Sequence, residues 1–259
     1  MQSSFTLDAG TLFRSFWIET LPCDGRHVLL ACFPKSGSTW LSGILSRLPG
    51  FIKADLVPGY DRREQELCFE RLLVYHAENY VAQHHCRYSQ STERCLRAFS
   101  IEPVVLIRNL FDCVVSLRDH IDGGISDPAR VIGPTAYVPE DYFGWSDDVR
   151  TDFIVDMIVP WYFNFYLGWR DCPDAVWVGY EELVRDPSAT VRRIADAVGL
   201  DADDAAIEQA LRAASSQPTR RNVGVVGRGR SLSERHRQRI RQLASYYPAC
   251  DFAPIGLMR

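Results

Sequence analysis

The sequence lacks the features that mark secreted, membrane-spanning or nucleic-acid-binding proteins. It has eight cysteines in 259 residues, none in a Cys-x-x-Cys pair, and a formal net charge of −4. No apolar run approaches the roughly 20 residues that cross a membrane, and no signal-peptide pattern is present. An acidic chain also lacks the overall positive charge that attracts nucleic acid. We therefore expect a cytoplasmic protein with unpaired thiols, no membrane insertion and no nucleic-acid partner.

The chain also lacks the Gly-Lys-Ser/Thr motif of nucleoside-triphosphate-binding loops. Residues 28–33 instead form an apolar run typical of a buried parallel strand, and residues 40–47 carry apolar side chains at helical spacing. The segment between them, Pro34-Lys-Ser-Gly-Ser-Thr-Trp40, has its lysine before the glycine. A small-residue loop between a strand and a helix predicts an anion site, because N–H groups at the helix start point toward the ligand. Lys35 would add a positive charge.

Further along the chain, strand and helix patterns alternate. Strands are predicted within residues 75–82, 103–108 and 175–180. Residues 51–60 are predicted to be a connection without regular structure. Helices are predicted at 62–74, 92–98, 110–120, 151–170, 188–198, 205–214 and 232–246. This order predicts an α/β fold, a three-layer sandwich with a central parallel sheet flanked by helices, in one domain over residues 1–259. Lys35, Arg108 and Tyr180 would share the carboxyl edge of that sheet, where such folds bind ligands.

Residues 120–147 contain several glycines and prolines and no periodicity, which predicts a lid or acceptor-binding loop. Its aromatic side chains, and those of the 151–170 helix, are candidates for lining an apolar acceptor pocket. For the helix, a role in the core is the simpler interpretation. The candidates are Tyr137, Tyr142, Phe143, Trp145, Trp161, Tyr162 and Phe165.

The 34–40 segment resembles the loop with which sulfotransferases bind the 5′-phosphosulfate of 3′-phosphoadenosine 5′-phosphosulfate (PAPS). Family members usually read Pro-Lys-(Ser/Ala)-Gly-(Ser/Thr)-Thr-Trp, and this chain matches all seven positions. The resemblance implies the P-loop-like sulfotransferase fold, with PAPS as the co-substrate. It also implies a contacting set of Lys35, Ser36, Gly37, Ser38, Thr39 and Trp40.

Three further segments resemble the same family. Arg108 and Ser116, eight residues apart, match the motif that holds the 3′-phosphate of PAPS, and Tyr180 opens a segment like the one beside the adenine. Arg221 and Gly224 belong to a segment resembling Arg-Lys-Gly-x-x-Gly, although the two residues before the first glycine are Asn and Val. Arg228 follows the second glycine, so either arginine is a candidate for completing the 3′-phosphate site. The other arginines, at 235–241, are expected on a solvated helix face.

The resemblance implies sulfuryl transfer from PAPS to a hydroxyl, less often an amine, of a small-molecule or carbohydrate acceptor. The product is adenosine 3′,5′-bisphosphate (PAP). Lys35 is expected to stabilise the leaving phosphate, and a histidine to accept the proton. His85 is favoured because Gln83-His84-His85 stands where many family members have Lys-Thr-His. Its neighbour His84 and a carboxylate remain alternative bases. The carboxylate candidates are Asp55, Glu64 and Glu66.

A metal site was weighed for His76, His84, His85 and Cys86, which are near one another in sequence. Adjacent side chains of a strand face opposite ways, so these residues do not converge easily on one ion, and we expect no metal. A small-molecule kinase and a catalytically inactive PAPS-binding sensor or scaffold are the alternative functions. Acceptor identity and oligomeric state, including a homodimer, remain open.

Overall fold

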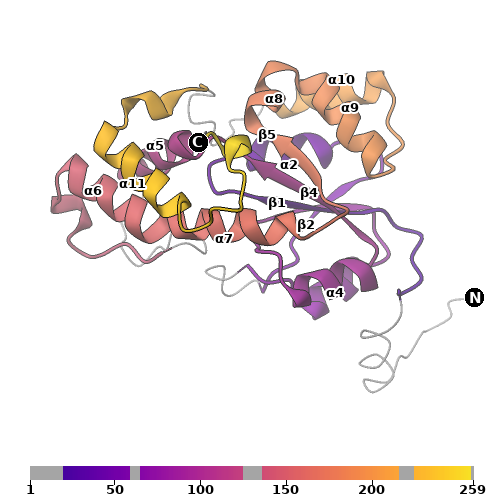
Figure 1. The fold of residues 1–259 in the computed structure, drawn as a ribbon. Coiled ribbons are helices and arrows are strands. Elements are labelled where there is room, and N and C mark those ends of the chain that lie inside the picture. Colours follow the sequence, from indigo (N-terminus) through magenta and orange to yellow (C-terminus); the bar gives the residue numbers. More distant parts are fainter. Residues whose placement is uncertain (1–19, 59–64, 125–135, 216–224, 258–259) are drawn as a thin grey trace, which may run out of the picture.

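The computed structural model describes residues 20–58, 65–124, 136–215 and 225–257. Five parallel strands form one sheet in the order β2-β3-β1-β4-β5 (Figure 1). The strands are β1 (His27–Cys32), β2 (Ile52–Ala54), β3 (Tyr80–His84), β4 (Ile101–Ile107) and β5 (Val176–Gly179). All six β1 residues are buried, and alternate side chains join opposite cores. A strand covered on both faces reads as a continuous apolar run, so the 28–33 pattern predicted it correctly.

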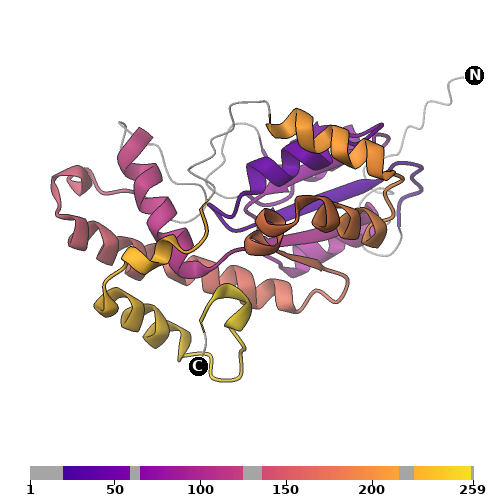
Figure 2. The same ribbon diagram turned by 90° about the horizontal axis from the view of Figure 1, so that it is seen from above.

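Helices cover both faces of the sheet, which gives the expected three layers (Figures 1 and 2). One apolar core lies beneath α2 (Ser38–Leu45), α8 (Tyr180–Arg185), α9 (Pro187–Ala197) and α10 (Asp204–Ser215). The other lies beneath α3 (Phe69–Tyr75), α4 (Gln90–Ala98), α5 (Leu110–Gly124), α7 (Val159–Arg170) and α11 (Glu234–Ala244). Among the described residues, no helix is both long and apolar enough to span a bilayer.

The aromatic helix is continuous, running through α6 (Asp147–Phe153), a π-helical turn at Ile154–Ile158 and α7. Its rings pack into the core: Trp161 is 7% exposed, Tyr162 1% and Phe165 0%. The structure thus confirms the core interpretation of these aromatics. Short 3-10 turns occur at Tyr142–Gly144, Arg228–Ser231 and Ala253–Ile255.

Three sequence predictions differ from the structure. The 51–60 connection contains β2, an edge strand of three residues whose first two are exposed, so it lacks a buried pattern. Helix α3 begins at Phe69, later than expected, and residues 59–64 lie outside the described part of the chain. The predicted 120–147 loop begins as helix, because α5 extends to Gly124. Residues 125–135 of that loop are also outside the described residues.

Candidate active site

The loop between β1 and α2 has a backbone conformation that its small residues make possible. Gly37 has φ of 85°, and a Cβ there would lie 2.6 Å from Cε2 of the Tyr180 ring, so only glycine fits. Lys35 also has a positive φ, 67°, which is uncommon for a residue with a side chain. Helix α2 follows directly at Ser38. The N–H groups of Trp40 and Leu41 donate to Gly37 O at 3.0 and 3.2 Å. Those of Ser38 and Thr39, at the start of the helix, are the ones placed to bind an anion.

Several side chains hold the carbonyl groups of this loop. Ser36 is fully buried and its Oγ donates to Phe33 O at 2.7 Å, so its hydroxyl fixes the turn. The buried Tyr162 hydroxyl donates to Pro34 O at 2.9 Å, and Arg108 Nη1 donates to Lys35 O at 3.0 Å. These bonds hold the carbonyl groups of Phe33, Pro34 and Lys35 toward the protein, and the Ser36 N–H donates within the loop, to Phe33 O at 3.3 Å.

Arg108 connects three parts of the site at the carboxyl end of β4. It is 4% exposed, and its guanidinium carbon lies 4.3 Å from the centre of the Tyr180 ring. Its Nη2 donates to Val225 O at 3.0 Å and to Asp112 Oδ2 at 3.3 Å. Its Nε is buried and has no hydrogen-bond partner in the described structure. A buried donor without a partner costs free energy, so this atom favours an anionic ligand nearby.

The carboxylate of Asp112 in α5 binds the backbone of the C-terminal segment. Asp112 is buried, and its two oxygens accept from the N–H groups of Gly227 at 2.8 Å and Gly229 at 2.7 Å. A Cβ at Gly229 would lie 2.4 Å from Cβ of Phe111, so the close approach requires glycine. Asp112 therefore holds both Arg108 and the 225–231 segment. The sequence showed this aspartate in the motif without indicating its role.

The arginines of the C-terminal region fall into two groups. Arg228 is only slightly exposed and forms an ion pair with Asp119 of α5. In α11, Arg235 pairs with Asp152 and Arg239 with Asp156, which forms the solvated ionic face that the sequence predicted. Arg237 instead is half-buried and donates to Gly229 O and Arg230 O. Predicted residues Arg221 and Gly224 lie outside the described residues, so their proposed contacts stay predictions.

The remaining predicted binding residues occupy the same edge of the sheet. Ser38 is buried and its Oγ accepts from Gln83 Nε2 at 2.9 Å, which ties the loop to the end of β3. Ser116 is buried in α5, two turns beyond its start. Thr39 is exposed and Trp40 half-buried. Their contacts with a ligand stay predictions.

His85, immediately after β3, is held in the form that a base requires. Its Nδ1 lies 2.8 Å from Cys32 O, and a carbonyl only accepts, so Nδ1 carries the proton and Nε2 the lone pair. Burial lowers the pKa of His85; the Cys32 carbonyl opposes this shift and the Lys35 charge adds to it. Burial also raises the pKa of the neighbouring Cys32 thiol to about 12, so that group stays protonated. A neutral imidazole beside a lysine thus lies at the loop.

Of the alternative bases that the structure describes, His84 and Glu66 are placed less favourably than His85. His84 is buried, and its Nε2 accepts the Leu56 N–H at 3.0 Å, which occupies the lone pair a base would use. Its Nε2 is also 4.0 Å from Asp55 Oδ1. Of the carboxylates, Glu66 is exposed and Glu64 lies outside the described residues. Geometry therefore favours His85.

A family model for the sulfotransferase domain matches residues 25–239. The chain belongs to the sulfotransferase family. The match begins before the lysine loop and ends in α11, so it spans every element of the site described above. The family expected from the sequence motifs is thereby confirmed. A comparison with curated protein sequences finds no significant match.

Solved structures confirm the fold of this sulfotransferase. The mouse sulfotransferase SULT7A1 in complex with PAP aligns with a TM-score of 0.65 and 17% identity, covering 95% of this chain and 92% of that one. A retinol dehydratase in complex with androsterone and the inactive cofactor PAP aligns with a TM-score of 0.51 and 13% identity. The alignment covers 85% of this chain and 80% of that one. At these identities the likeness establishes the three-layer fold with its parallel sheet.

Proposed function

We propose that this protein transfers a sulfuryl group from PAPS to a hydroxyl of a small-molecule or carbohydrate acceptor. The observation that carries the proposal is the juxtaposition of the Lys35 loop with Arg108, Tyr180 and a neutral His85 at one edge of the sheet. Two structures that share the fold were solved with PAP, which supports the choice of nucleotide.

The residues present fit such a nucleotide. The N–H groups at the start of α2 suit the 5′-phosphosulfate end. The buried Arg108 Nε, which has no hydrogen-bond partner among the described residues, suits a phosphate, and we assign it the 3′-phosphate together with Ser116. The buried Tyr180 ring packs against Gly37 and the Arg108 guanidinium, and we assign Tyr180 to the adenine end of the site. We also assign Ser36, Ser38, Thr39, Trp40 and the C-terminal Arg221, Gly224 and Arg228 to this site.

PAPS supplies the activated sulfuryl group, and the protein supplies positioning, a base and a charge. His85 Nε2 accepts the proton of the acceptor hydroxyl as the oxygen attacks sulfur. Lys35 stabilises the negative charge that develops on the bridging oxygen when the S–O bond breaks. Asp112 keeps Arg108 and the 225–231 segment in place. No metal ion is assigned a part in the transfer.

The acceptor is assigned only by class. Of the aromatics considered for its pocket, Tyr142 is fully buried, whereas Tyr137 is 65% and Phe143 41% exposed. The two exposed rings are the residues of the 120–147 segment that we propose contact an acceptor. The buried rings support the fold.

The decisive experiment is calorimetric titration with PAP, with AMP and ATP as controls, in EDTA and again with Mg²⁺. We expect tight PAP binding in EDTA that AMP does not reproduce, because AMP lacks the 3′-phosphate. Turnover of PAPS on a panel of phenols, alcohols and sugars then identifies the acceptor class. ATP binding that requires Mg²⁺ would instead indicate a kinase. PAP binding without turnover on any acceptor would indicate a sensor or scaffold.

We also infer that the protein works in a reducing compartment such as the cytoplasm. All eight cysteines lie among the described residues and none is in a disulfide, and six of them are buried. Titration of thiols in denaturant without reductant should count eight. A lower count in freshly isolated protein would contradict this inference.

A further inference from the structure

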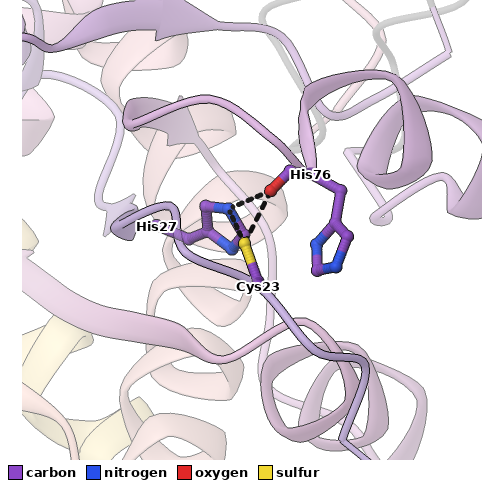
Figure 3. A group of neighbouring side chains, drawn as sticks. All are labelled: Cys23, His27 and His76. Atoms are coloured by element: carbon purple, nitrogen blue, oxygen red, sulfur yellow. Dashed lines mark hydrogen bonds between the residues drawn. The ribbon is translucent and has the colours of Figure 1, made fainter. Parts of the chain in front are cut away.

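Three side chains that can ligate metals meet at the amino edge of the sheet, opposite the Lys35 loop (Figure 3). Cys23 precedes β1, His27 is the first residue of β1, and His76 follows the end of α3. One donor atom from each lies within 4.8 Å of the others. His27 is buried, and the other two are half-buried. Two segments of chain that are distant in sequence, residues 23–27 and His76, thus converge on one point.

The hydrogen bonds of His27 leave an electron-rich centre there. Its Nδ1 lies 2.6 Å from Phe99 O and therefore carries a proton, so in the neutral imidazole the lone pair is on Nε2. That Nε2 lies 2.9 Å from His76 O and 3.4 Å from Cys23 Sγ. The sulfur is in turn 2.7 Å from His76 O. A nitrogen lone pair and a carbonyl oxygen repel at this distance unless a proton or a cation lies between them.

His76 has a matching arrangement. Its Nε2 lies 3.0 Å from Pro22 O and therefore donates to it, while Nδ1 is buried and has no partner in the described structure. His76 thus has one nitrogen bound to a backbone carbonyl and the other without a partner in the described structure, whereas His27 Nε2 lies beside both His76 O and Cys23 Sγ. Metal-binding histidines characteristically have such an outer hydrogen bond, which fixes the tautomer and the ring orientation.

We propose that Cys23, His27 and His76 form a binding site for Zn²⁺. One thiolate and two imidazoles are a donor set that zinc prefers. Ligands at 2.3 Å for sulfur and 2.0–2.1 Å for nitrogen on a tetrahedral ion are roughly 3.5 Å apart, and Cys23 Sγ and His27 Nε2 are 3.4 Å apart. The wider 4.8 Å limit of the cluster requires His76 to approach by about 1 Å. Its half-buried place after α3 permits this shift, and water would complete the fourth position.

The site differs from the metal cluster considered in the sequence. His84 and His85 are at the other end of β3, at the carboxyl edge, while His76 precedes that strand. Cys23 and His27 are 49 or more residues from His76 along the chain, so only the fold brings them together. Zinc here would attach the segment before β1 to the sheet and to α3. Its role is therefore structural and independent of sulfuryl transfer.

The test uses the full-length protein, stripped with a chelator and titrated with Co²⁺ and then Zn²⁺. We expect one equivalent of Co²⁺ to bind with a thiolate-to-cobalt absorption band in the near ultraviolet, and Zn²⁺ to displace it, with a zinc Kd below about 1 μM. At a hundredfold excess over Kd, zinc should raise the Tm by roughly 5–10 °C.

Matched variants show which residues bind the metal ion. Cys23→Ser should abolish the band and the Tm shift, and His76→Gln should weaken zinc binding by about tenfold or more. Cys68→Ser, which changes another half-buried thiol, should leave both unchanged. His27 is not substituted, because its ring stacks 4.5 Å from Tyr80 in the core. Absence of saturable binding in the wild type, or an unchanged band in Cys23→Ser, would overturn the proposal. PAP titration of the same samples reports the nucleotide site separately.

Discussion

The two edges of the sheet gather reactive side chains in opposite ways. At the carboxyl edge, Lys35 and Arg108 are positive, and the pKa of His85 is lowered so that it stays neutral. The N–H groups at the start of α2 and the two cationic side chains suit an anionic ligand. At the amino edge, a thiol, two imidazoles and a backbone carbonyl converge. Lone pairs there suit a cation.

The difference also concerns how each edge is built. The anion site is centred on one continuous loop, which has positive φ values at Lys35 and Gly37 and which Arg108 and Tyr180 contact from other segments. The cation site depends on two segments, residues 23–27 and His76, that only the tertiary structure brings together. Changes at the carboxyl edge should therefore affect turnover, and changes at the amino edge should affect metal binding and stability.

The largest effect is expected for His85→Asn, which removes the proposed base. We expect kcat to fall by about 10²–10⁴-fold, with PAP affinity nearly unchanged. His84→Asn is the matched control: it keeps an acceptor for the Leu56 N–H and should lose only a few-fold in kcat. Single-turnover rates at saturating PAPS provide the measurement. Normal rates in His85→Asn would transfer the role to His84 or a carboxylate.

Lys35→Ala should lower kcat by about 10²–10³-fold, because it removes the charge that stabilises the leaving oxygen. PAP affinity should change much less, since the N–H groups of the loop remain. Lys53→Ala, on the exposed edge strand β2, is the control for loss of a lysine and should behave as wild type. Unchanged turnover of Lys35→Ala at saturating PAPS would contradict this role.

Arg108→Ala should weaken PAP binding by roughly 10- to 100-fold, the loss of a charged hydrogen bond worth about 1.5–3 kcal/mol. AMP, which lacks the 3′-phosphate, should bind wild type and variant alike. Calorimetry with both ligands makes the comparison, and Tm reports the lost contacts to Lys35 O and Val225 O. Arg239→Ala, at a surface pair, is the control. Retained preference for PAP over AMP in Arg108→Ala would refute the assignment.

The pH dependence should reflect the lowered pKa of His85. A histidine base with a pKa below the ordinary 6.5 is already neutral at about pH 7. The value of kcat/KM should therefore be constant through neutral pH and fall only in more acidic solution. The unfolded chain binds the proton more readily, so stability from this group is full above 6.5 and is lost as pH falls toward the folded pKa. Measurements of kcat/KM and of Tm over the same pH range check the expectation for turnover and the expectation for stability. A rising limb centred above 7 would contradict the assignment.

Sequence reasoning succeeded where structure is local. The 28–40 segment predicted a strand, a loop and a helix, and all three occur in that order. The run before Arg108 and the helix after it were likewise evident from periodicity. Edge strand β2 was missed because three residues with two exposed leave no pattern.

Contacts between distant segments could not be predicted in the same way. The Tyr162 hydroxyl donates to Pro34 O, although the two residues are 128 positions apart in the sequence. Asp112 accepts from the Gly229 N–H, 117 positions away. Neither pairing has a spacing that a single sequence can reveal. The amino-edge cluster has the same origin, because Cys23 and His76 are 53 residues apart. A cluster of histidines close in sequence was considered for metal, while a more compact group was assembled by the fold.

The smallest effect on catalysis is expected for Cys23→Ser. A strand of six residues separates its neighbour His27 from the Lys35 loop, a span of roughly 17–20 Å. We expect kcat, KM and PAP affinity to stay within about twofold of wild type, since coupling between the sites would need an element with two arrangements. A large loss of turnover in a folded Cys23→Ser protein would show that the edges are coupled. An unchanged turnover, together with loss of the zinc-dependent Tm shift, would establish that one sheet carries an anion site for chemistry and a cation site for stability.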